Sequence, residues 1–304
     1  MNDKILVLGA DGLVGSRFTD LYHKETPTIT PKNEELDITN KKAVELYFET
    51  YKNEFHSVIN FAAFTDVDGA EKEKGDEKGA VYLVNTVGAQ NLAEATKAFD
   101  KYLIQISTDF VFPGTEEDPG PYPEDAKLSD NPGDLTWYGW TKLVGEKRVR
   151  QINKNASIVR ISYPYRAQFA GKLDYARKIL SLYDEGGLYP MFSDQKITPT
   201  FIDEAAKVIY LLLEEKKVGI YHITSCDLTT PFEFANYILE KAKGVKRAVT
   251  EGSMKEFLEV PGRAPRPRLG GLLTEKTRKE LGITLMTWKE AVDEFVSQFK
   301  GGPA

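Results

Sequence analysis

Tyr138 and Lys142 are the two residues whose types and spacing best suit proton transfer. They lie four positions apart in a predicted helix, so both side chains leave one face and the ammonium can stand near the phenol. A free tyrosine has a pKa of about 10, and a neighbouring cation lowers that pKa by favouring the phenolate. We therefore expect Tyr138 to serve as a general acid or base. An isolated Tyr/Lys pair with this spacing usually lies on an exposed helix face by chance. The surrounding sequence must therefore show whether this pair is functional.

A hydroxyl-bearing segment at the end of a predicted strand supports the functional interpretation. Ser107-Thr108-Asp109 ends an apolar run that begins at Tyr102. Parallel α/β sheets hold their ligands at the carboxyl ends of the strands, so Thr108 can hydrogen-bond a substrate carbonyl there while Tyr138 supplies the proton. Thr108 could instead cap a turn. Asn60-Phe-Ala-Ala63 also ends a strand with small residues, as a flat cofactor crossing the sheet edge requires.

A glycine-rich turn stands near the start of the chain. Gly9, Gly12 and Gly15 follow the apolar run Lys4–Leu8 and precede a predicted helix over Ser16–Lys24. A tight strand-to-helix turn needs residues without a Cβ, and a pyrophosphate needs bare backbone N–H groups beside the positive end of a helix. Glycine-rich turns are common, but this position directly after the first strand predicts a dinucleotide site.

The elements that position these residues alternate between strand and helix. Further strands are predicted near Thr28–Thr30, His56–Phe61, Tyr102–Ser107 and Ser157–Ser162. A long helix with an apolar stripe is predicted over Gly79–Phe99. This alternation predicts an α/β fold, a Rossmann-type doubly wound parallel sheet with right-handed crossovers.

The chain is predicted to divide into a dinucleotide-binding domain and a smaller C-terminal substrate-binding lobe. We assign residues 1–163 to the first, together with a returning helix near 201–215, and residues 164–200 and 216–304 to the second, which is less regular and richer in proline. A Pro/Gly/Asp/Glu-rich stretch over 112–135 is too long for a simple connector, so we expect a lid, a binding loop or a disordered segment there.

Composition excludes several classes of protein. With 41% hydrophobic and 28% charged residues among 304, the chain can form a core and is not disordered as a whole. Its 40 Lys and Arg residues against 46 Asp and Glu residues lack the basic excess of a general nucleic-acid binder. The single cysteine, Cys226, cannot form an internal disulfide, and no Cys/His cluster has metal-ligand spacing. Without a basic leader or a run of about 18 apolar residues, we expect a soluble cytoplasmic protein.

Taken together, these motifs resemble the extended short-chain dehydrogenase/reductase family, and within it the dTDP-4-dehydrorhamnose reductase family. The segments that carry the resemblance are LDITN at 36–40, AAFTDVDGAE at 62–71, STDFVFPG at 107–114, YGWTKLVGEK at 138–147 and RPRLGGLLTEK at 266–276. They cover nearly the whole chain in the family's order. The resemblance implies an NAD(P)-dependent oxidoreductase acting on a CH–OH group, here a reductase of a nucleotide-linked 4-keto sugar.

The resemblance also implies roles for individual residues. It makes Thr108, Tyr138 and Lys142 catalytic: Tyr138 protonates the sugar C4 oxygen, Thr108 holds that oxygen, and Lys142 lowers the tyrosine pKa and binds the nicotinamide ribose. The residues implied to contact the cofactor are Gly9, Asp11, Gly12, Leu13, Val14, Gly15, Thr30, Lys32, Asp37, Ile38, Phe61, Ala62, Ala63, Thr65, Asn85, Ser107, Tyr138, Lys142 and Ser162. The residues implied to contact the substrate are Asp68, Thr108, Phe110, Arg263 and Arg266. No carboxylate set for a metal is found.

Two departures from the family's pattern refine the expectation. At the end of the second strand, where many members carry an acidic residue, this chain has Thr30-Pro31-Lys32. A carboxylate there binds the 2′-hydroxyl of NAD, whereas Lys32 can meet a 2′-phosphate, so NADP(H) is favoured over NAD(H). After Thr-Asp, sugar-nucleotide 4,6-dehydratases carry a glutamate as base, but this chain has Phe110, which favours simple carbonyl reduction.

The arginine-rich stretch Gly262–Arg268 is a candidate for binding the pyrophosphate of the substrate. Prolines at 261, 265 and 267 stiffen it, and guanidinium groups match phosphate oxygens in a fork geometry. We predict that Arg266 contacts that pyrophosphate, with Arg263 or Arg268 as a second contact. A solvated basic loop is the competing interpretation.

Two other functions stay open at this level. An epimerase of the same fold would recycle its cofactor, and a cofactor-binding regulatory subunit resembling the β subunit of methionine adenosyltransferase would act by binding a partner. The intact set of Thr108, Tyr138 and Lys142 favours an enzyme. The expected partner is a small-molecule nucleotide sugar, and binding to nucleic acid or to a membrane is not expected. Assembly into a homodimer is left open.

Overall fold

A computed structural model of the chain describes residues 4–260 and 263–300, and two compact units can be distinguished in it. The first unit contains the residues up to Val111, Ser129–Arg160 and Ala206–Tyr221. The second contains Phe112–Leu128, Ile161–Ala205 and the residues from His222 onward. Each unit has a hydrophobic core of its own.

The first unit is built on a parallel sheet of six strands in the order β2-β1-β3-β4-β5-β7. The strands are β1 (Ile5–Leu8), β2 (Thr28–Ile29), β3 (Ser57–Asn60), β4 (Tyr102–Thr108), β5 (Ala156–Ile161) and β7 (Gly219–His222). The chain runs outward from β1 to one side and then from β3 to the other, so the direction of winding switches between these two strands. Ligands of doubly wound sheets bind beyond the carboxyl ends of the strands at such a switch point. The predicted fold class is confirmed.

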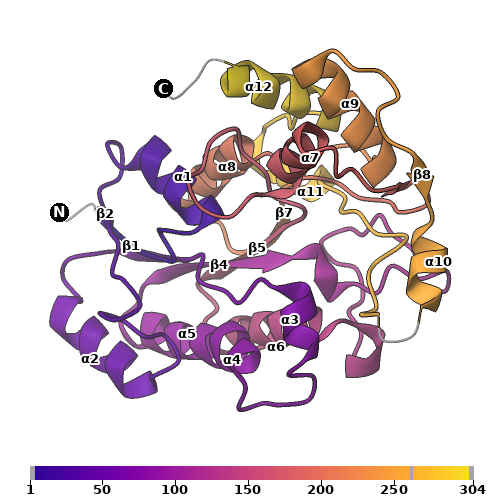
Figure 1. The fold of residues 1–304 in the computed structure, drawn as a ribbon. Helices are drawn as coiled ribbons and strands as arrows, with labels where there is room; N and C mark the ends of the chain where they lie inside the picture. The colour runs from indigo at the N-terminus through magenta and orange to yellow at the C-terminus, as the bar shows by residue number, and fades with distance from the viewer. Residues whose placement is uncertain (1–3, 261–262, 301–304) are drawn as a thin grey trace. The chain divides into compact units, whose positions relative to one another are not determined.

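Helices cover both faces of this sheet (Figure 1). On one face lie α1 (Leu13–Tyr22) and α8 (Ile202–Glu214), joined by the stacked rings of Tyr22 and Tyr210 with centroids 4.4 Å apart. On the other face lie α2 (Lys41–Tyr51), α3 (Val67–Glu71), α4 (Ala80–Tyr82), α5 (Ala89–Ala98) and α6 (Trp137–Ile152). A π-helical turn, η1 (Leu83–Gly88), joins α4 to α5, so the long helix predicted over 79–99 is present with an irregular turn in its middle.

Strands β1 and β3 are both buried along their whole length. Burial on both faces fits the unbroken apolar sequence of β1, whereas β3 has its two apolar residues between Ser57 and Asn60. Their register pairs Leu8 with Asn60, so the glycine turn after β1 and the small residues after β3 start side by side. The backbone N–H of Phe61 donates to the Leu8 carbonyl at 2.9 Å and fixes this alignment.

The second unit consists mainly of helices packed around an aromatic core. Its elements are α7 (Tyr175–Asp184), β6 (Met191–Phe192), α9 (Pro231–Lys243), β8 (Glu251–Gly252), α10 (Met254–Glu259), α11 (Glu275–Leu281) and α12 (Trp288–Lys300). The ring of Tyr165 contacts those of Phe234 and Phe295, with centroids 5.4 and 5.5 Å apart. These three side chains are fully buried.

The first part of the stretch predicted as a lid, a binding loop or a disordered segment is ordered and hydrogen-bonded within the second unit. The backbone N–H groups of Gly120 and Tyr122 donate to Leu269 and Gly271 at 2.7 and 2.9 Å, and the Phe112 ring stacks on Tyr122 with centroids 4.1 Å apart. Residues 112–128 therefore belong to the second unit, whereas the sequence placed them in the first. The reason is a partner about 150 residues away, which local sequence does not reveal.

Candidate functional site

The glycine turn after β1 has the geometry that its sequence predicts. Gly9 has a φ of +69°, and a Cβ there would lie 2.6 Å from the Ala62 nitrogen. A Cβ on Gly15 would lie 2.3 Å from the Gly9 carbonyl oxygen. Gly12 is the N-cap of α1, and its N–H donates to the Gly9 carbonyl at 3.1 Å. Because glycine brings no side chain, the positive end of α1 stays open to a ligand.

A pocket of about 530 Å³ is lined by this turn and by the residues that follow β2 and β3. The predicted cofactor residues that line it are Gly9, Asp11, Gly12, Thr30, Lys32, Ile38, Phe61, Ala62 and Ala63. The lining residues that were not predicted are Leu8, Ala10, Ser16, Thr19, Asp20, Pro31, Asn33, Leu36 and Val84. Ser16, Thr19 and Asp20 occupy one face of α1, so the helical period applied to the sequence would have found them.

The remaining predicted cofactor residues do not line this pocket. They are Leu13, Val14, Gly15, Asp37, Thr65, Asn85, Ser107, Tyr138, Lys142 and Ser162. The Asp37 carboxylate accepts hydrogen bonds from the backbone N–H and the hydroxyl of Thr39, at 2.9 and 2.8 Å, so it is turned toward its own loop. Thr65 and the predicted substrate residue Asp68 are exposed at the start of α3.

The end of β2 carries the residue expected to select the cofactor. Lys32 is exposed and lines the pocket, and its backbone N–H donates to the Glu35 carboxylate at 2.8 Å. Asp11 and Asp20 line the same pocket, so its charges are mixed.

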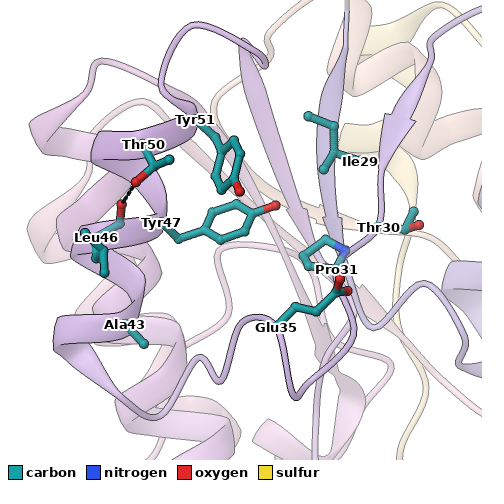
Figure 2. Close-up of a pocket in the computed structure, with 9 residues that line it drawn as sticks. All are labelled: Ile29, Thr30, Pro31, Glu35, Ala43, Leu46, Tyr47, Thr50 and Tyr51. Atoms are coloured by element: carbon teal, nitrogen blue, oxygen red, sulfur yellow. Dashed lines mark hydrogen bonds between the residues drawn. The ribbon is translucent and has the colours of Figure 1, made fainter.

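A second pocket, of about 600 Å³, shares Thr30 and Pro31 with the first and lies between the segment after β2 and α2 (Figure 2). Tyr47 and Tyr51 present their rings to it, with centroids 4.6 Å apart. Burial raises the pKa of Tyr47 to about 12, so this hydroxyl stays protonated. The predicted catalytic residues do not line this pocket.

Tyr138 stands in the first turn of α6, and two local features place it. The Thr136 hydroxyl caps the helix by accepting the Gly139 N–H at 2.9 Å. A Cβ on Gly139 would lie only 2.1 Å from the Phe110 carbonyl oxygen, so glycine lets α6 pack tightly on the turn η2 (Asp109–Val111). The Phe110 ring meets the Tyr138 ring edge-on, with centroids 5.7 Å apart. The phenol is thereby held at the end of β4.

The pKa of Tyr138 differs from the sequence-based expectation. The pKa of Tyr138 is raised to about 12, mainly by burial. A hydrogen bond with the Thr108 hydroxyl partly opposes this rise, and the charge of Asp109 adds to it. This direction is opposite to the lowering expected from Lys142, and no cation is among the causes of the shift, in which burial of the phenol is the largest. Thr108 and Asp109 are both buried, and the Thr108 hydroxyl donates to the Asp109 carboxylate at 3.2 Å.

Lys142 is the buried cation of this site. Its side chain is 4% exposed, and its ammonium donates to the Ile106 carbonyl at 2.7 Å. Burial lowers the pKa of Lys142 to about 8, and the charge of Glu146, one turn further along α6, partly opposes this. Lys142 is thus directed at the last residues of β4.

Asn85 has a different environment from the predicted cofactor contact. Its side-chain carbonyl accepts the Phe64 N–H at 2.9 Å, and its amide donates to the Phe64 carbonyl and to the Thr141 hydroxyl, both at 3.2 Å. It therefore ties the loop after β3 to the helix that carries Tyr138 and Lys142. The π-helical turn that contains Asn85 is a local irregularity of the kind frequent at functional sites.

Two serines close the set of predicted cofactor residues. Ser107 is 3% exposed, and its hydroxyl has no hydrogen-bond partner among the described residues. A buried hydroxyl without a partner is costly, so this atom fits a site that a ligand completes. Ser162 belongs to the second unit, and its backbone N–H donates to the Thr200 hydroxyl at 3.0 Å.

The predicted pyrophosphate-binding arginines lie in the second unit, and the structure separates them by environment. Arg268 forms an ion pair with Glu116 at 2.6 Å and is already neutralised. The Arg263 guanidinium lies 4.5 Å from the centroid of the Phe257 ring and is exposed, while Arg266 is partly buried. Pro261 and Gly262, which belong to the same predicted stretch, lie outside the described residues.

The described part of the chain offers neither a group of metal ligands nor a membrane-spanning helix. Across residues 4–260 and 263–300, no three His, Cys, Asp or Glu side chains are grouped so as to hold a metal ion. Within the same ranges, no helix combines the length and the apolarity needed to cross a membrane. Cys226 is a free thiol whose pKa is raised by burial.

Known proteins resemble this chain in sequence and in fold. The family described as RmlD substrate binding domain matches residues 3–300. The spore coat polysaccharide biosynthesis protein SpsK of Bacillus subtilis is 30% identical over 297 residues, which is 97% of each chain. A dTDP-4-dehydrorhamnose reductase of Mycolicibacterium smegmatis is 30% identical over 305 residues, covering 99% of this chain and 87% of the relative. The solved dTDP-4-dehydrorhamnose reductase of Bacillus anthracis, in complex with NADP, superposes with a TM-score of 0.85 at 27% identity, covering 98% of this chain and all of the other.

Proposed function

The chain belongs to the RmlD substrate binding domain family, and we propose that it uses NAD(P)H to reduce the keto group of a nucleotide-linked 4-keto sugar. The observation that carries this proposal is the placement of Thr108 and Tyr138 at the end of β4 with Lys142 buried beside them. These are the groups that reduction of a carbonyl needs from the protein: a hydrogen bond to the oxygen, a proton and a nearby positive charge.

Tyr138 is proposed as the proton donor. When bound, the nicotinamide supplies a hydride to the carbonyl carbon, and the protein must then deliver a proton to the oxygen. With a pKa of about 12, Tyr138 is protonated across the neutral range and is therefore in the acid form that reduction requires. The Thr108 hydroxyl, which is hydrogen-bonded to Tyr138, is proposed to hold the same oxygen.

Lys142 is proposed to hold the ribose next to the nicotinamide and to provide positive charge beside the reacting oxygen. With its pKa lowered to about 8, it is mostly protonated at neutral pH and loses its charge in mildly alkaline solution. The buried ammonium acts in surroundings of low dielectric constant, where its charge has a larger effect than it would have in water.

The pocket at the glycine turn is proposed to hold the rest of the cofactor. Gly9 and Gly12 leave room for a pyrophosphate at the start of α1. The Ser107 hydroxyl lies outside this pocket and has no hydrogen-bond partner among the described residues, so we propose that it contacts another part of the cofactor. NADPH is proposed in preference to NADH because Lys32 lines this pocket where a carboxylate would select NAD.

The second unit is proposed to bind the nucleotide sugar. Arg266 and Arg263 are proposed to neutralise its pyrophosphate through paired hydrogen bonds. Arg268 is the weaker alternative, since Glu116 already takes its charge.

One assay tests the proposal against the competing functions. The chain is mixed with NADPH and dTDP-4-dehydrorhamnose, and the absorbance of NADPH is followed while the sugar is analysed. A steady loss of NADPH with formation of the reduced sugar is expected. Conversion of the sugar without net loss of NADPH would mean an epimerase, and binding of NADPH without any conversion would mean a regulatory subunit. The control is Tyr138→Phe, which should bind NADPH but oxidise it about 100-fold to 10,000-fold more slowly.

A further inference from the structure

Arg160 and Glu146 form a buried ion pair next to Lys142. The Arg160 guanidinium donates to both carboxylate oxygens of Glu146, at 3.0 and 2.7 Å. The two side chains are 0% and 2% exposed. A buried ion pair seldom stabilises a fold more than apolar side chains of similar volume would, because both charges must leave water. This pair therefore calls for an explanation other than stability.

The position of the pair on α6 suggests that explanation. Glu146 follows Lys142 by four residues, a spacing at which an acid and a base on a helix can form an ion pair with each other. Instead, both Glu146 oxygens bind Arg160 of β5, and the Lys142 ammonium donates to the Ile106 carbonyl of β4. The lysine is thus directed at the end of the strand that carries Thr108, one turn away from the carboxylate that could capture it.

We propose that Arg160 is a positioning residue for Lys142: by occupying both oxygens of Glu146, it prevents a Lys142–Glu146 ion pair and keeps the ammonium at the end of β4. This inference rests on the proposed function, because it assumes that the ammonium is needed there. Arg160 itself is not proposed to touch the cofactor or the substrate.

The charges around Lys142 make the proposal specific. On α6 itself the titratable neighbours are Tyr138 and Glu146, and on the packed turn η2 there is Asp109. The helices α3 and α5 also pack on α6 and carry Asp68, Glu71, Glu94 and Lys97, of which Glu71 accepts the Trp137 N–H at 2.5 Å. Strand β4 and the turn η1 contribute no charged side chain, and β5 contributes Arg160. Glu146 is the charge that raises the pKa of Lys142 against the lowering by burial. Changing either member of the ion pair should therefore move that pKa, and in opposite directions.

Glu146→Gln keeps a side chain that can hydrogen-bond Arg160 but removes the negative charge. The Glu146 charge that raises the pKa of Lys142 is then gone while Arg160 stays, so the pKa of Lys142 should fall below its value of about 8. Arg160→Met removes the cation and leaves the Glu146 carboxylate available to Lys142, so the pKa should rise toward the ordinary value of 10.5. Arg160→Lys restores one cation and should return the pKa most of the way.

The experiment is an NMR titration of the full chain labelled with [ε-¹³C]lysine, with the Lys142 signal identified by its loss in Lys142→Met. The matched control is Arg177→Met, which breaks another buried ion pair, with Asp174, in the second unit. That variant should lose stability without moving the Lys142 pKa. The alkaline limb of kcat/KM for the wild type and both test variants should move with the measured pKa.

The Lys142 pKa is expected to shift in opposite directions in Glu146→Gln and Arg160→Met. General structural damage would not produce shifts of opposite sign. Shifts in the same direction, or no shift in Glu146→Gln, would overturn the proposal. Should Arg160→Met not fold, Arg160→Gln, which keeps a hydrogen-bonding side chain but carries no charge, takes its place: a rise in the pKa of Lys142 supports the proposal and an unchanged pKa refutes it. The titration needs no turnover, so a chain without reductase activity would refute the proposed function and leave this result readable by itself.

Discussion

Replacing Tyr138 by phenylalanine removes a single hydroxyl from the site. The ring keeps its edge-on contact with Phe110, and the cap of α6 at Thr136 is untouched. Only the hydrogen bond with Thr108 is lost, which costs about 1 kcal/mol of folding free energy. The loss of a general acid, by contrast, lowers a rate by about 100-fold to 10,000-fold, equivalent to roughly 3–5 kcal/mol in the barrier.

The two effects are measured separately. Turnover is followed as NADPH oxidation with dTDP-4-dehydrorhamnose, the affinity for NADPH is measured by fluorescence titration, and stability by thermal unfolding. We expect kcat to fall by the stated factor while the Kd for NADPH changes less than threefold and the chain stays folded. A variant with kcat within tenfold of the wild type would refute the assignment of the proton to Tyr138. Weaker NADPH binding with unchanged kcat would make Tyr138 a cofactor contact instead.

The remaining predictions concern the cofactor, the substrate and the glycine turn. Lys32→Ala should weaken the binding of NADPH by about 1 kcal/mol, because the site is exposed, and leave the binding of NADH unchanged. Competitive titrations with both cofactors measure this, and an equal loss of affinity for the two would contradict the preference for NADPH. Arg266→Ala should raise KM for the nucleotide sugar about tenfold, close to 1.4 kcal/mol, without changing the Kd for NADPH, and an unchanged KM would remove Arg266 from the substrate site. Gly9→Ala should destabilise the fold by roughly 1–3 kcal/mol in denaturant unfolding, because the φ of Gly9 is +69° and a Cβ there would collide with Ala62. Gly12→Ala should fold normally and bind NADPH more weakly, and the reverse pattern would contradict the roles of the two glycines.

The sequence predicted the fold and the main features of the pocket because the relevant signals are local. An unbroken apolar run predicts a strand buried on both faces, and β1 is buried throughout. The spacing of Gly9, Gly12 and Gly15 predicts a turn that excludes side chains. In the structure the positive φ of Gly9 and the close approach of backbone at Gly15 both require glycine. The helical spacing of Tyr138 and Lys142 likewise places both on one helix, α6.

What the sequence did not predict depends on partners that are distant along the chain. The pKa of Tyr138 is set by burial against its surroundings, and no spacing rule shows how deep a phenol will lie. Asn85 binds Phe64, and Arg268 binds Glu116, across separations of 21 and 152 residues. Such contacts form only when the sheet and the second unit have assembled their segments.

The most direct test of the central claim is the fate of the transferred hydride. The wild-type chain is incubated with dTDP-4-dehydrorhamnose and NADPH that carries deuterium at nicotinamide C4 on either face, and the product sugar is analysed by mass spectrometry and NMR. The proposed function predicts that deuterium from one face appears at the sugar C4 carbon, with one equivalent of NADP⁺ formed for each sugar reduced. A sugar product without deuterium from either cofactor, or with no net NADP⁺, would contradict reduction by this chain.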